Sequence, residues 1–396
     1  MAEALHVLIV RDREAAGGGI FNYYRAISKH QGGNVTLVDV GRAHGFYGID
    51  ELGSRGAFST LQRLLRDWWR LATSLSRFPD LVMLNPCLDP VENRSLPRDA
   101  VNLLLAKLFR RKVLVFWRGW DNDACGTPEF PGGNRGWLSR VYRLADAHIV
   151  LASDFRDDLR RWGFTSPVYL ESTVVADEVL ALRLDGLEEV PDSNSQFRIL
   201  YLSRVEVAKG VFEMLDAFAL LESGDPGRYH FTIAGDGPAL EELKLRAGEL
   251  GLSGVEFTGY VHGPGKARCF ADADAFCFLS YTEGMPNAVL EAMAMGLPLV
   301  SSDAGGLKDI LTDDVTGYIL RQDRSQPAGK RFLAAEVADR LKGLANSPEK
   351  LKRMGEHNRS YARERFAAAK VAARLDTIYG EVCDLPQFDS RASSSF

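Results

Sequence analysis

The sequence predicts an α/β protein with two doubly wound parallel sheets, one in each half of the chain. A chain of 396 residues is long for one hydrophobic core and suits two α/β domains of similar size. Short continuous apolar runs, such as residues 5–10 and 197–202, have the length and composition of buried parallel strands. Helical patterns separate most of these runs, which is typical of a parallel sheet.

The first half of the chain contains six runs of strand character. They lie at residues 5–10, 35–40, 81–84, 113–117, 147–151 and 168–169. Three glycines at 17–19 follow the first run and lead into a helical stretch at 20–30. We therefore expect a first domain over residues 1–190.

The second half of the chain also alternates strand-like runs with helical patterns. Its strand-like runs lie at 197–202, 230–234, 255–258, 275–279 and 299–302, with helices at 211–221 and from residue 239. The polar, turn-rich segment 191–196 predicts the linker between the domains. After Ser347, an N-cap residue followed by proline, the chain reads as helix to about residue 383. We expect a second domain at 197–365 and a C-terminal helix at 366–384.

Composition excludes several classes of protein. With 46% hydrophobic and 26% charged residues the chain is globular, and a net charge of −5 argues against a dedicated nucleic-acid binder. Five scattered cysteines without a Cys-x-x-Cys pair indicate neither a zinc site nor a disulfide framework, and they suit a reducing cytosol. No signal peptide or membrane-spanning apolar run is evident, so we expect a cytoplasmic protein, free or on a membrane surface.

Two carboxylates, Glu283 and Glu291, stand eight residues apart across a predicted loop-to-helix junction. Residues 285–287 supply helix-start signals, which places Glu283 in the loop and Glu291 about one turn inside the helix. The unpaired N–H groups of a helix N-terminus favour phosphate, and flanking carboxylates suit the hydroxyls of a ribose and a sugar. Glutamate near a helix start is also a common partner of the helix dipole, so the pair alone leaves both explanations open.

The segment 283–298 resembles the Glu-(seven residues)-Glu motif of retaining glycosyltransferases of the GT-B type, in particular the large family 4. The resemblance covers residues 197–320 and, more faintly, 5–177. It implies two Rossmann-like domains facing a cleft, with the acceptor in the first and the nucleotide-sugar in the second. It also implies sugar transfer with retention to a glycan or lipid-linked hydroxyl, in polysaccharide or lipopolysaccharide assembly.

The resemblance assigns roles to the residues of this motif. In the family the second glutamate holds the nucleotide ribose and the first contacts the donor sugar, which gives these roles to Glu291 and Glu283. Four residues between them join the predicted donor site, namely Met285, Pro286, Asn287 and Ala288.

Arg204 and Lys209 follow the 197–202 strand, and both could reach a diphosphate at the carboxyl end of that strand. Taken alone, two solvated loop charges would be the commoner explanation. The stretch from Leu202 to Gly210 resembles the family's Gly-Arg…Lys-Gly pattern, with Ser203 in place of the usual glycine. The resemblance implies that both cations stabilise the leaving diphosphate and, since no Asp-x-Asp is evident, that no metal or other cofactor is needed.

Several loop residues complete the predicted donor site. Gly235 and Gly237 follow the 230–234 strand and permit close approach of a ligand. In the family this loop shapes the nucleotide pocket, and main-chain groups near Tyr260 and Val261 meet the base. Gly18 is the best candidate for a contact with the distal phosphate, with a plain tight turn as the alternative. The glycines at 17–19 do not continue as Gly-x-Gly-x-x-Gly, so the sequence gives little support for a nicotinamide-cofactor site there.

Arg118 follows the 113–117 strand, where many family members place a histidine that lines the sugar and acceptor pocket. An arginine cannot titrate there, but it can hold an acceptor phosphate or a carboxylated sugar. A structural salt bridge is an equally good explanation. Asp121 and Ser153 are further candidates for the acceptor site.

Two other functions fit the same architecture. One is a non-catalytic GT-B subunit that binds a nucleotide-sugar or a glycan. The presence of all four predicted site residues counts against it, namely Glu283, Glu291, Arg204 and Lys209. The other is a nucleotide-sugar epimerase, which would need acid–base carboxylates in place of an acceptor site.

Residues 55–112 are basic, with 11 Lys and Arg against 5 Asp and Glu. One predicted helical face in this stretch is apolar and consists of Leu61, Leu64, Leu65, Trp68, Trp69, Ala72 and Leu75. The stretch ends in the triplet Arg110, Arg111 and Lys112. The apolar face alone is better explained by packing on its own sheet, but the basic excess predicts peripheral binding to an anionic membrane.

Overall fold

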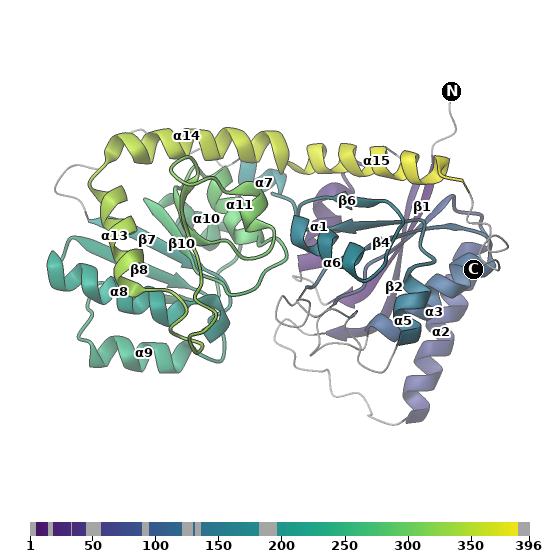
Figure 1. Cartoon of the computed structure of the whole chain (residues 1–396), viewed down its shortest axis with the longest axis horizontal. Coiled ribbons are helices and arrows are strands. Elements are labelled where there is room, and N and C mark those ends of the chain that lie inside the picture. The colour runs from purple at the N-terminus through teal and green to yellow at the C-terminus, as the bar shows by residue number, and fades with distance from the viewer. Residues whose placement is uncertain are drawn as a thin grey trace. The chain divides into compact units, whose positions relative to one another are not determined.

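The computed structural model describes residues 5–14, 19–32, 34–44, 57–88, 95–120, 130, 136–181 and 196–386 (Figure 1). The chain divides into two compact units. The first comprises Met1–Thr173 together with Ala368–Phe396, and the second comprises Val174–Ala367.

The first unit contains a six-stranded parallel sheet in the order β2-β1-β3-β4-β5-β6. Its strands are β1 (His6–Glu14), β2 (Asn34–His44), β3 (Leu81–Leu84), β4 (Lys112–Phe116), β5 (Ala147–Val150) and β6 (Val168–Leu170). Its helices are α1 (Gly19–Ile27), α2 (Ala57–Leu75), α3 (Ser95–Leu108), α5 (Gly136–Tyr142), α6 (Ser153–Arg161) and α15 (Ala368–Asp384). Every residue of β3 and β5 is buried, because helices cover both faces of a doubly wound sheet.

The second unit contains another six-stranded parallel sheet, in the order β12-β11-β10-β7-β8-β9. Its strands are β7 (Phe197–Leu202), β8 (Tyr229–Ala234), β9 (Val255–Gly259), β10 (Ala275–Phe278), β11 (Leu299–Ser302) and β12 (Gly317–Leu320). Its helical elements are α7 (Asp177–Leu180), η1 (Val207–Lys209), α8 (Val211–Gly224), α9 (Leu240–Glu249), α10 (Gly263–Ala271), α11 (Asn287–Ala294), α12 (Leu307–Ile310), α13 (Ala334–Ala345) and α14 (Pro348–Arg365). Helices α8 and α9 lie on one side of this sheet, and α10 and α11 lie on the other (Figure 1).

The predicted fold class, two doubly wound parallel sheets, is confirmed. The sequence reading did not include β12, a four-residue strand at the edge of the second sheet. The long helix predicted to about residue 383 is two helices, α14 and α15, with a break at Phe366 and Ala367.

The boundary between the units differs from the predicted one at 191–196. The second unit already begins at Val174, because Val175 N–H donates to the Phe366 carbonyl at 2.8 Å and α7 packs against α11. Residues 182–195, which include most of the predicted linker, lie outside the described residues.

The apolar residues of α2 share one side of the helix, as the sequence indicated, but only part of that side is buried. Leu71 and Leu75 are fully buried, whereas Leu65 is 54% exposed and Trp69 is 72% exposed. The cause is the position of the sheet, which covers a narrower stripe of the helix than the apolar pattern spans. The side chain of Leu61 lies outside the described residues, and no described helix is both long and apolar enough to cross a bilayer.

His148 of β5 is a buried titratable group in the core of the first unit. Its Nδ1 accepts a hydrogen bond from Trp117 Nε1 at 3.3 Å, and its ring meets Phe164 edge-on. Burial, with a smaller contribution from the charge of Arg160, lowers the pKa of His148 from 6.5 to about 3. The native state therefore holds this imidazole neutral over the range in which an unfolded chain would protonate it.

We expect the first unit to lose stability as the pH falls below 6.5, because only the unfolded chain then protonates His148. The loss due to this group amounts to about 2 kcal/mol between pH 6.5 and 5. All 6 tryptophans lie in the first unit, so tryptophan fluorescence in urea at each pH reports on it alone. His148→Asn should reduce the fall in the free energy of unfolding below pH 6.5, whereas His357→Asn, a change at an exposed histidine, should not reduce it. If this free energy falls equally steeply in both variants, other groups cause the acid sensitivity.

Candidate functional site

The second sheet reverses its strand order between β10 and β7, and this switch point organises the predicted donor residues. Lys209 follows β7 and Glu283 follows β10, so both stand beyond the carboxyl ends of neighbouring parallel strands. In open α/β sheets ligands bind at such a point. The topology therefore brings two residues that are 74 positions apart to one place.

Lys209 and Glu283 form an ion pair. The Lys209 Nζ lies 2.5 Å from the Glu283 Oε1, and the two side chains are only 15% and 12% exposed. The same Nζ lies 3.5 Å from the Ser280 hydroxyl and 5.9 Å from the centre of the Phe278 ring. Each of the two predicted catalytic groups is thus neutralised by the other.

Two glycines allow the loops of this site to pack together. Gly210, directly after Lys209, has a φ of +69°, and a Cβ there would lie 2.4 Å from the Leu279 carbonyl oxygen. Gly305 has a φ of +56°, and its Cβ would lie 1.8 Å from the Glu283 carbonyl oxygen. Any other residue would force apart the loops that carry the ion pair.

A buried hydrogen-bond network supports the loop that carries Glu283. The Tyr281 hydroxyl donates to Glu213 Oε1 at 2.6 Å and accepts the Gly329 N–H at 2.6 Å. The Arg331 N–H donates to the same Glu213 oxygen at 3.0 Å. Burial, together with the hydrogen bond to Glu213, raises the pKa of Tyr281 and keeps it a donor. The sequence reading missed Glu213, because no local pattern links a carboxylate in α8 to a tyrosine 68 residues later.

Arg204 stands apart from the ion pair. Its side chain is 69% exposed, and its NH1 group lies 3.0 Å from the Glu206 carboxylate. The structure therefore places Arg204 on the predicted loop, with a side chain free of the core. Its contact with a diphosphate stays a prediction.

Gly235 and Gly237 are close to protein backbone. A Cβ at Gly235 would lie 1.8 Å from the Ser203 carbonyl oxygen, and one at Gly237 would lie 2.4 Å from the Val205 carbonyl oxygen. Val205 N–H also donates to the Asp236 carbonyl at 2.9 Å. These glycines thus hold the loop that carries Arg204, and their contact with a nucleotide stays a prediction.

Glu291 lies in the second turn of α11 and is 8% exposed. Its Oε2 lies 2.5 Å from the Nζ of Lys266 on α10. No motif marks Lys266, and the sequence reading missed it. Nearby in sequence, Tyr260 is 48% exposed and stacks on His262 at 5.9 Å, while Val261 is half-buried.

Helix α11 begins where the sequence predicted a helix start, and phosphate binding there stays a prediction. Pro286 is the N-cap with extended backbone, and Asn287 and Ala288 are the first two helical residues. Their N–H groups precede the first helical hydrogen bond, which Val289 N–H makes to Pro286 at 3.2 Å. Met285, just before the helix, is buried at 7% exposure.

In the first unit, Arg118 follows β4 and is held by neutral partners. Its Nε donates to Asn85 Oδ1 at 3.0 Å, and its NH2 group donates to the Tyr24 hydroxyl at 3.1 Å. The guanidinium stacks on the rings of Phe116 and Tyr23, 3.6 Å and 4.0 Å from their centres. The hydrogen-bond partners of Arg118 among the described residues are therefore neutral groups.

The other predicted residues of the first unit are Ser153, Gly18 and Asp121. Ser153 is the first residue of α6 and is half-buried. Gly18 and Asp121 lie outside the described residues. Among the described residues no group of three or more His, Cys, Asp or Glu side chains could hold a metal ion.

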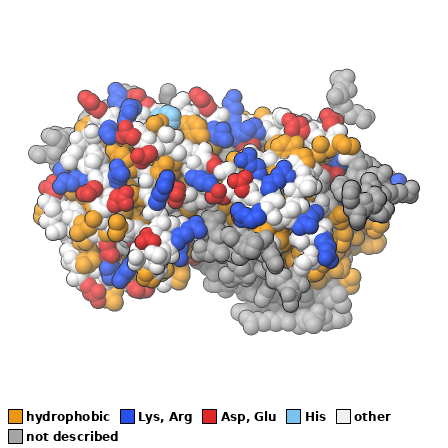
Figure 2. All heavy atoms as spheres, viewed as in Figure 1, with side chains coloured by type: hydrophobic (Ala, Val, Ile, Leu, Met, Phe, Trp, Pro, Cys, Tyr) orange, Lys and Arg blue, Asp and Glu red, His pale blue; other side chains and the backbone are white. Residues whose placement is uncertain are grey.

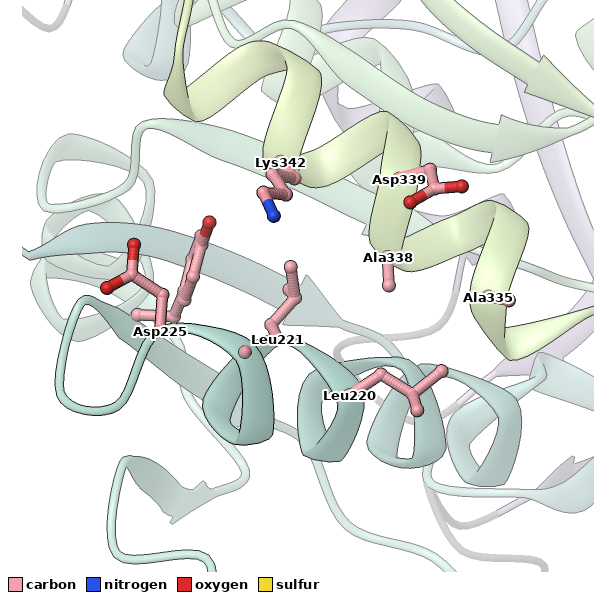
Figure 3. Close-up of a pocket in the computed structure, with 9 residues that line it drawn as sticks. Leu220, Leu221, Asp225, Ala335, Ala338, Asp339 and Lys342 are labelled. Carbon is pink, nitrogen blue, oxygen red and sulfur yellow. The ribbon is translucent and has the colours of Figure 1, made fainter.

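A separate pocket lies between α8 and α13 (Figure 3). Leucines and alanines form much of its lining, and Lys342 reaches toward it from α13. None of the predicted site residues lines this pocket.

The comparison with protein families gives a match to the second half of the chain. Residues 188–361 match the family model described as glycosyl transferases group 1. This segment is similar to the glycosyl transferases group 1. The matched segment contains all of the predicted donor residues except Gly18, and it supports the resemblance seen in the sequence.

Solved structures of glycosyltransferases share the fold over nearly the whole chain. Anabaena Alr3699/HepE in complex with UDP superposes with a TM-score of 0.70 at 16% identity, covering 95% of this chain and 100% of that one. The lipopolysaccharide outer core galactosyltransferase WaaB in its apo form gives a TM-score of 0.66 at 16% identity, again covering 95% and 100%. The fold is therefore GT-B, as the resemblance implied.

Curated relatives match over shorter stretches. Alpha-D-kanosaminyltransferase of Streptomyces kanamyceticus is 28% identical over 255 residues, which are 62% of this chain and 63% of that protein. GalNAc-alpha-(1->4)-GalNAc-alpha-(1->3)-diNAcBac-PP-undecaprenol alpha-1,4-N-acetyl-D-galactosaminyltransferase of Campylobacter jejuni is 29% identical over 182 residues, 45% of this chain and 50% of that protein. The chain thus spans between half and two thirds of the length of these relatives.

Proposed function

We propose that this protein is a glycosyltransferase that moves a sugar from a nucleoside-diphosphate donor to a hydroxyl acceptor with retention of configuration. The observation that carries the proposal is the ion pair of Lys209 with Glu283 at the sheet's switch point, in the same motif as α11 and Glu291. The match to the glycosyl transferases group 1 covers these residues.

The ion pair suggests how the donor binds. A diphosphate between Lys209 and the N-terminus of α11 would draw the ammonium away from Glu283, because phosphate oxygens carry more charge than one carboxylate. Glu283 would then be free to accept hydroxyls of the donor sugar. Arg204, with its exposed side chain, would close on the diphosphate as a second cation.

In the reaction the bond between the anomeric carbon and the diphosphate oxygen breaks, and the acceptor oxygen bonds to the same carbon on the same face. The departing phosphate takes the acceptor's proton, so no separate general base is required. Lys209 and Arg204 stabilise the charge that grows on the leaving group, and Glu283 steadies the positive anomeric centre. Nucleoside diphosphate and the glycoside are the products.

For the acceptor we propose a glycan or a lipid-linked sugar that carries a phosphate or a carboxylate, held by Arg118. The neutral partners of Arg118 among the described residues support an anionic group of the acceptor there. The undecaprenol named in the Campylobacter relative supports a lipid-linked acceptor. Such a reaction belongs to polysaccharide or lipopolysaccharide assembly in the cytoplasm, at the inner face of the membrane.

Incubation with UDP-, GDP-, ADP- and dTDP-sugars, with and without isolated cell-envelope lipid as acceptor, tests the proposed activity. A transferase releases nucleoside diphosphate and forms a glycoside whose anomeric configuration, read by proton NMR, equals that of the donor. An epimerase would convert the donor sugar without releasing nucleoside diphosphate. A non-catalytic subunit would bind a donor and change nothing. Inversion of configuration would contradict the retaining mechanism.

We expect transfer to proceed in EDTA. Two cations, Lys209 and Arg204, are available to neutralise the leaving diphosphate, which is the task that a bound metal performs in other transferases. The rate with 5–10 mM EDTA, about a thousandfold above trace metal, should stay within twofold of the untreated rate. Complete loss on chelation, with recovery on adding Mg²⁺ or Mn²⁺, would contradict this prediction.

The first unit presents an apolar and basic surface that suits an anionic membrane. On α2, Trp69 and Leu65 are exposed, and Leu108 at the end of α3 is 76% exposed. The exposed Arg66 and Arg70 lie on the same helix as Trp69. Figure 2 shows apolar and basic side chains next to each other in this part of the first unit. Exposed aromatic groups insert at the interface while arginines bind headgroups.

We expect the protein to cosediment with vesicles of phosphatidylglycerol at low salt and to dissociate as salt rises. The triplet 110–112 is a poor choice for a charge reversal, because Lys112 is bound to the Leu385 carbonyl at 2.5 Å. The triple change of Arg66, Arg70 and Arg110 to Glu should abolish binding, since each cation contributes about 1 kcal/mol. A matched reversal of exposed charges in the second unit, Lys342, Lys352 and Arg363 to Glu, should leave binding unchanged. Absence of wild-type binding at low salt would contradict the membrane proposal.

A further inference from the structure

We propose that the pocket between α8 and α13 binds a small carboxylic acid with an apolar body, of about the size of benzoate. None of the predicted donor or acceptor residues lines this pocket, so the inference does not depend on the proposed function. It gives the second unit a ligand site separate from the predicted donor site.

The pocket has room for one small apolar group. Its volume is about 140 Å³, and an engineered apolar cavity of about 150 Å³ binds benzene. Leu220 and Leu221 of α8 and Ala335 and Ala338 of α13 form the apolar part of the lining. The side chains of Leu221 and Ala338 each point toward the opposite helix (Figure 3). An apolar ligand group between the two helices would therefore be shielded from water on both sides.

Tyr229, the first residue of β8, contributes a buried hydroxyl to the lining. The residue is 1% exposed, and its hydroxyl has no hydrogen-bond partner among the described residues. Burial raises the pKa of Tyr229, so the hydroxyl keeps its proton at neutral pH and can donate it. Because buried polar groups in proteins are nearly always hydrogen-bonded, this hydroxyl favours a ligand that accepts a hydrogen bond.

Lys342 brings a positive charge to the same pocket. Its side chain extends from α13 toward α8 (Figure 3). Two carboxylates also line the pocket, but neither opposes an anionic ligand at Lys342. Asp225 is paired with the guanidinium of Arg228 at 2.9 Å, and Asp339 points away from Lys342 (Figure 3). The ammonium is thus placed to bind a negatively charged group of a ligand.

The lining as a whole matches a carboxylic acid with an apolar body. A carboxylate has two oxygens that accept hydrogen bonds, so it can take one from the Tyr229 hydroxyl and one from the Lys342 ammonium. The ring or short carbon chain of the acid then lies between the leucines and alanines. A sugar fits less well, because the apolar side chains would leave several of its hydroxyls without partners. An amine or a metal ion would be repelled by the ammonium.

Saturation-transfer NMR of the full chain with benzoate and with the neutral benzyl alcohol tests this inference. Benzoate should bind with a Kd of about 1 mM, as expected for a ligand of so few atoms. Benzyl alcohol should bind at least about fivefold more weakly, because it lacks the charge that the ammonium recognises. Lys342→Met should weaken benzoate binding about fivefold and change benzyl alcohol binding little. Tyr229→Phe removes only the hydroxyl and should weaken benzoate binding about threefold to tenfold.

Two further variants place the binding site. Ala338→Leu, which fills the pocket, should abolish binding of both probes. If it does not fold by circular dichroism, Lys342→Met and Tyr229→Phe still decide the question. Lys352→Met, a change at an exposed lysine of α14 outside the pocket, is the matched control and should change neither affinity.

Three results would overturn the inference. The first is the absence of saturable benzoate binding up to about 10 mM, ten times the expected Kd. The second is equal affinity for benzoate and benzyl alcohol, because the site would then be a plain apolar cavity. The third is benzoate binding that folded Lys342→Met and Tyr229→Phe leave unchanged, because the acid would then bind elsewhere on the protein.

Discussion

Replacing Lys209 by alanine is expected to lower the rate of transfer by about 10²–10³-fold, the usual cost of losing one charge-stabilising contact in a transition state. Lys209 is the described ion-pair partner of Glu283, and its side chain is only 15% exposed. The loss should fall mainly on kcat, since the charge of the leaving diphosphate is greatest in the transition state.

The substitution also leaves Glu283, 12% exposed, without its described ion-pair partner. We therefore expect a modest fall in stability, which the double variant Lys209→Ala, Glu283→Gln should reverse without restoring activity. Exposed Lys244→Ala serves as the control for a lost lysine. Wild-type turnover by folded Lys209→Ala would remove this residue from the proposed site.

Gly305→Ala is expected to have the largest effect on the second unit. The new Cβ would lie 1.8 Å from the Glu283 carbonyl oxygen, and the backbone at a φ of +56° disfavours a side chain. Because backbone lies on both sides of the contact, the loops must separate, at a cost of about 3 kcal/mol or more. Nucleotide affinity should fall with stability, since the displaced loop carries Glu283.

The control for this glycine is Gly343→Ala. Gly343 lies in α13 with open space around its missing side chain, so alanine should stabilise the helix by about 0.5–1 kcal/mol. Calorimetric melting of both variants gives the comparison. A Gly305→Ala protein that melts like the wild type would show that the two loops are not packed as described.

Most strands of both sheets could be predicted because they are short apolar runs, and β3, β5, β10 and β11 are buried at every residue. β12 was not predicted, since the first of its four residues is a glycine, which is typical of a turn. The boundary near 191–196 was inferred from polarity alone, whereas the start of the second unit depends on a hydrogen bond between Val175 and Phe366, which no local pattern encodes.

The site was predictable where its residues follow strands in a recognisable motif. Lys209 and Glu283 were both named from the sequence, and the parallel topology then brings them together. Lys266 and Glu213 were not named, because each acts on a distant partner through tertiary packing and stands in an ordinary helix. On α2 the periodicity identified an apolar stripe but could not show which part of it, such as Trp69, the sheet leaves uncovered.

A crystal structure of the full chain with the nucleoside diphosphate that binds most tightly in titration tests the proposed donor site. We expect the diphosphate at the N-terminus of α11, with Lys209 moved from Glu283 onto a phosphate oxygen, and the ribose hydroxyls on Glu291. A nucleotide bound elsewhere, with the ion pair of Lys209 and Glu283 intact, would contradict it.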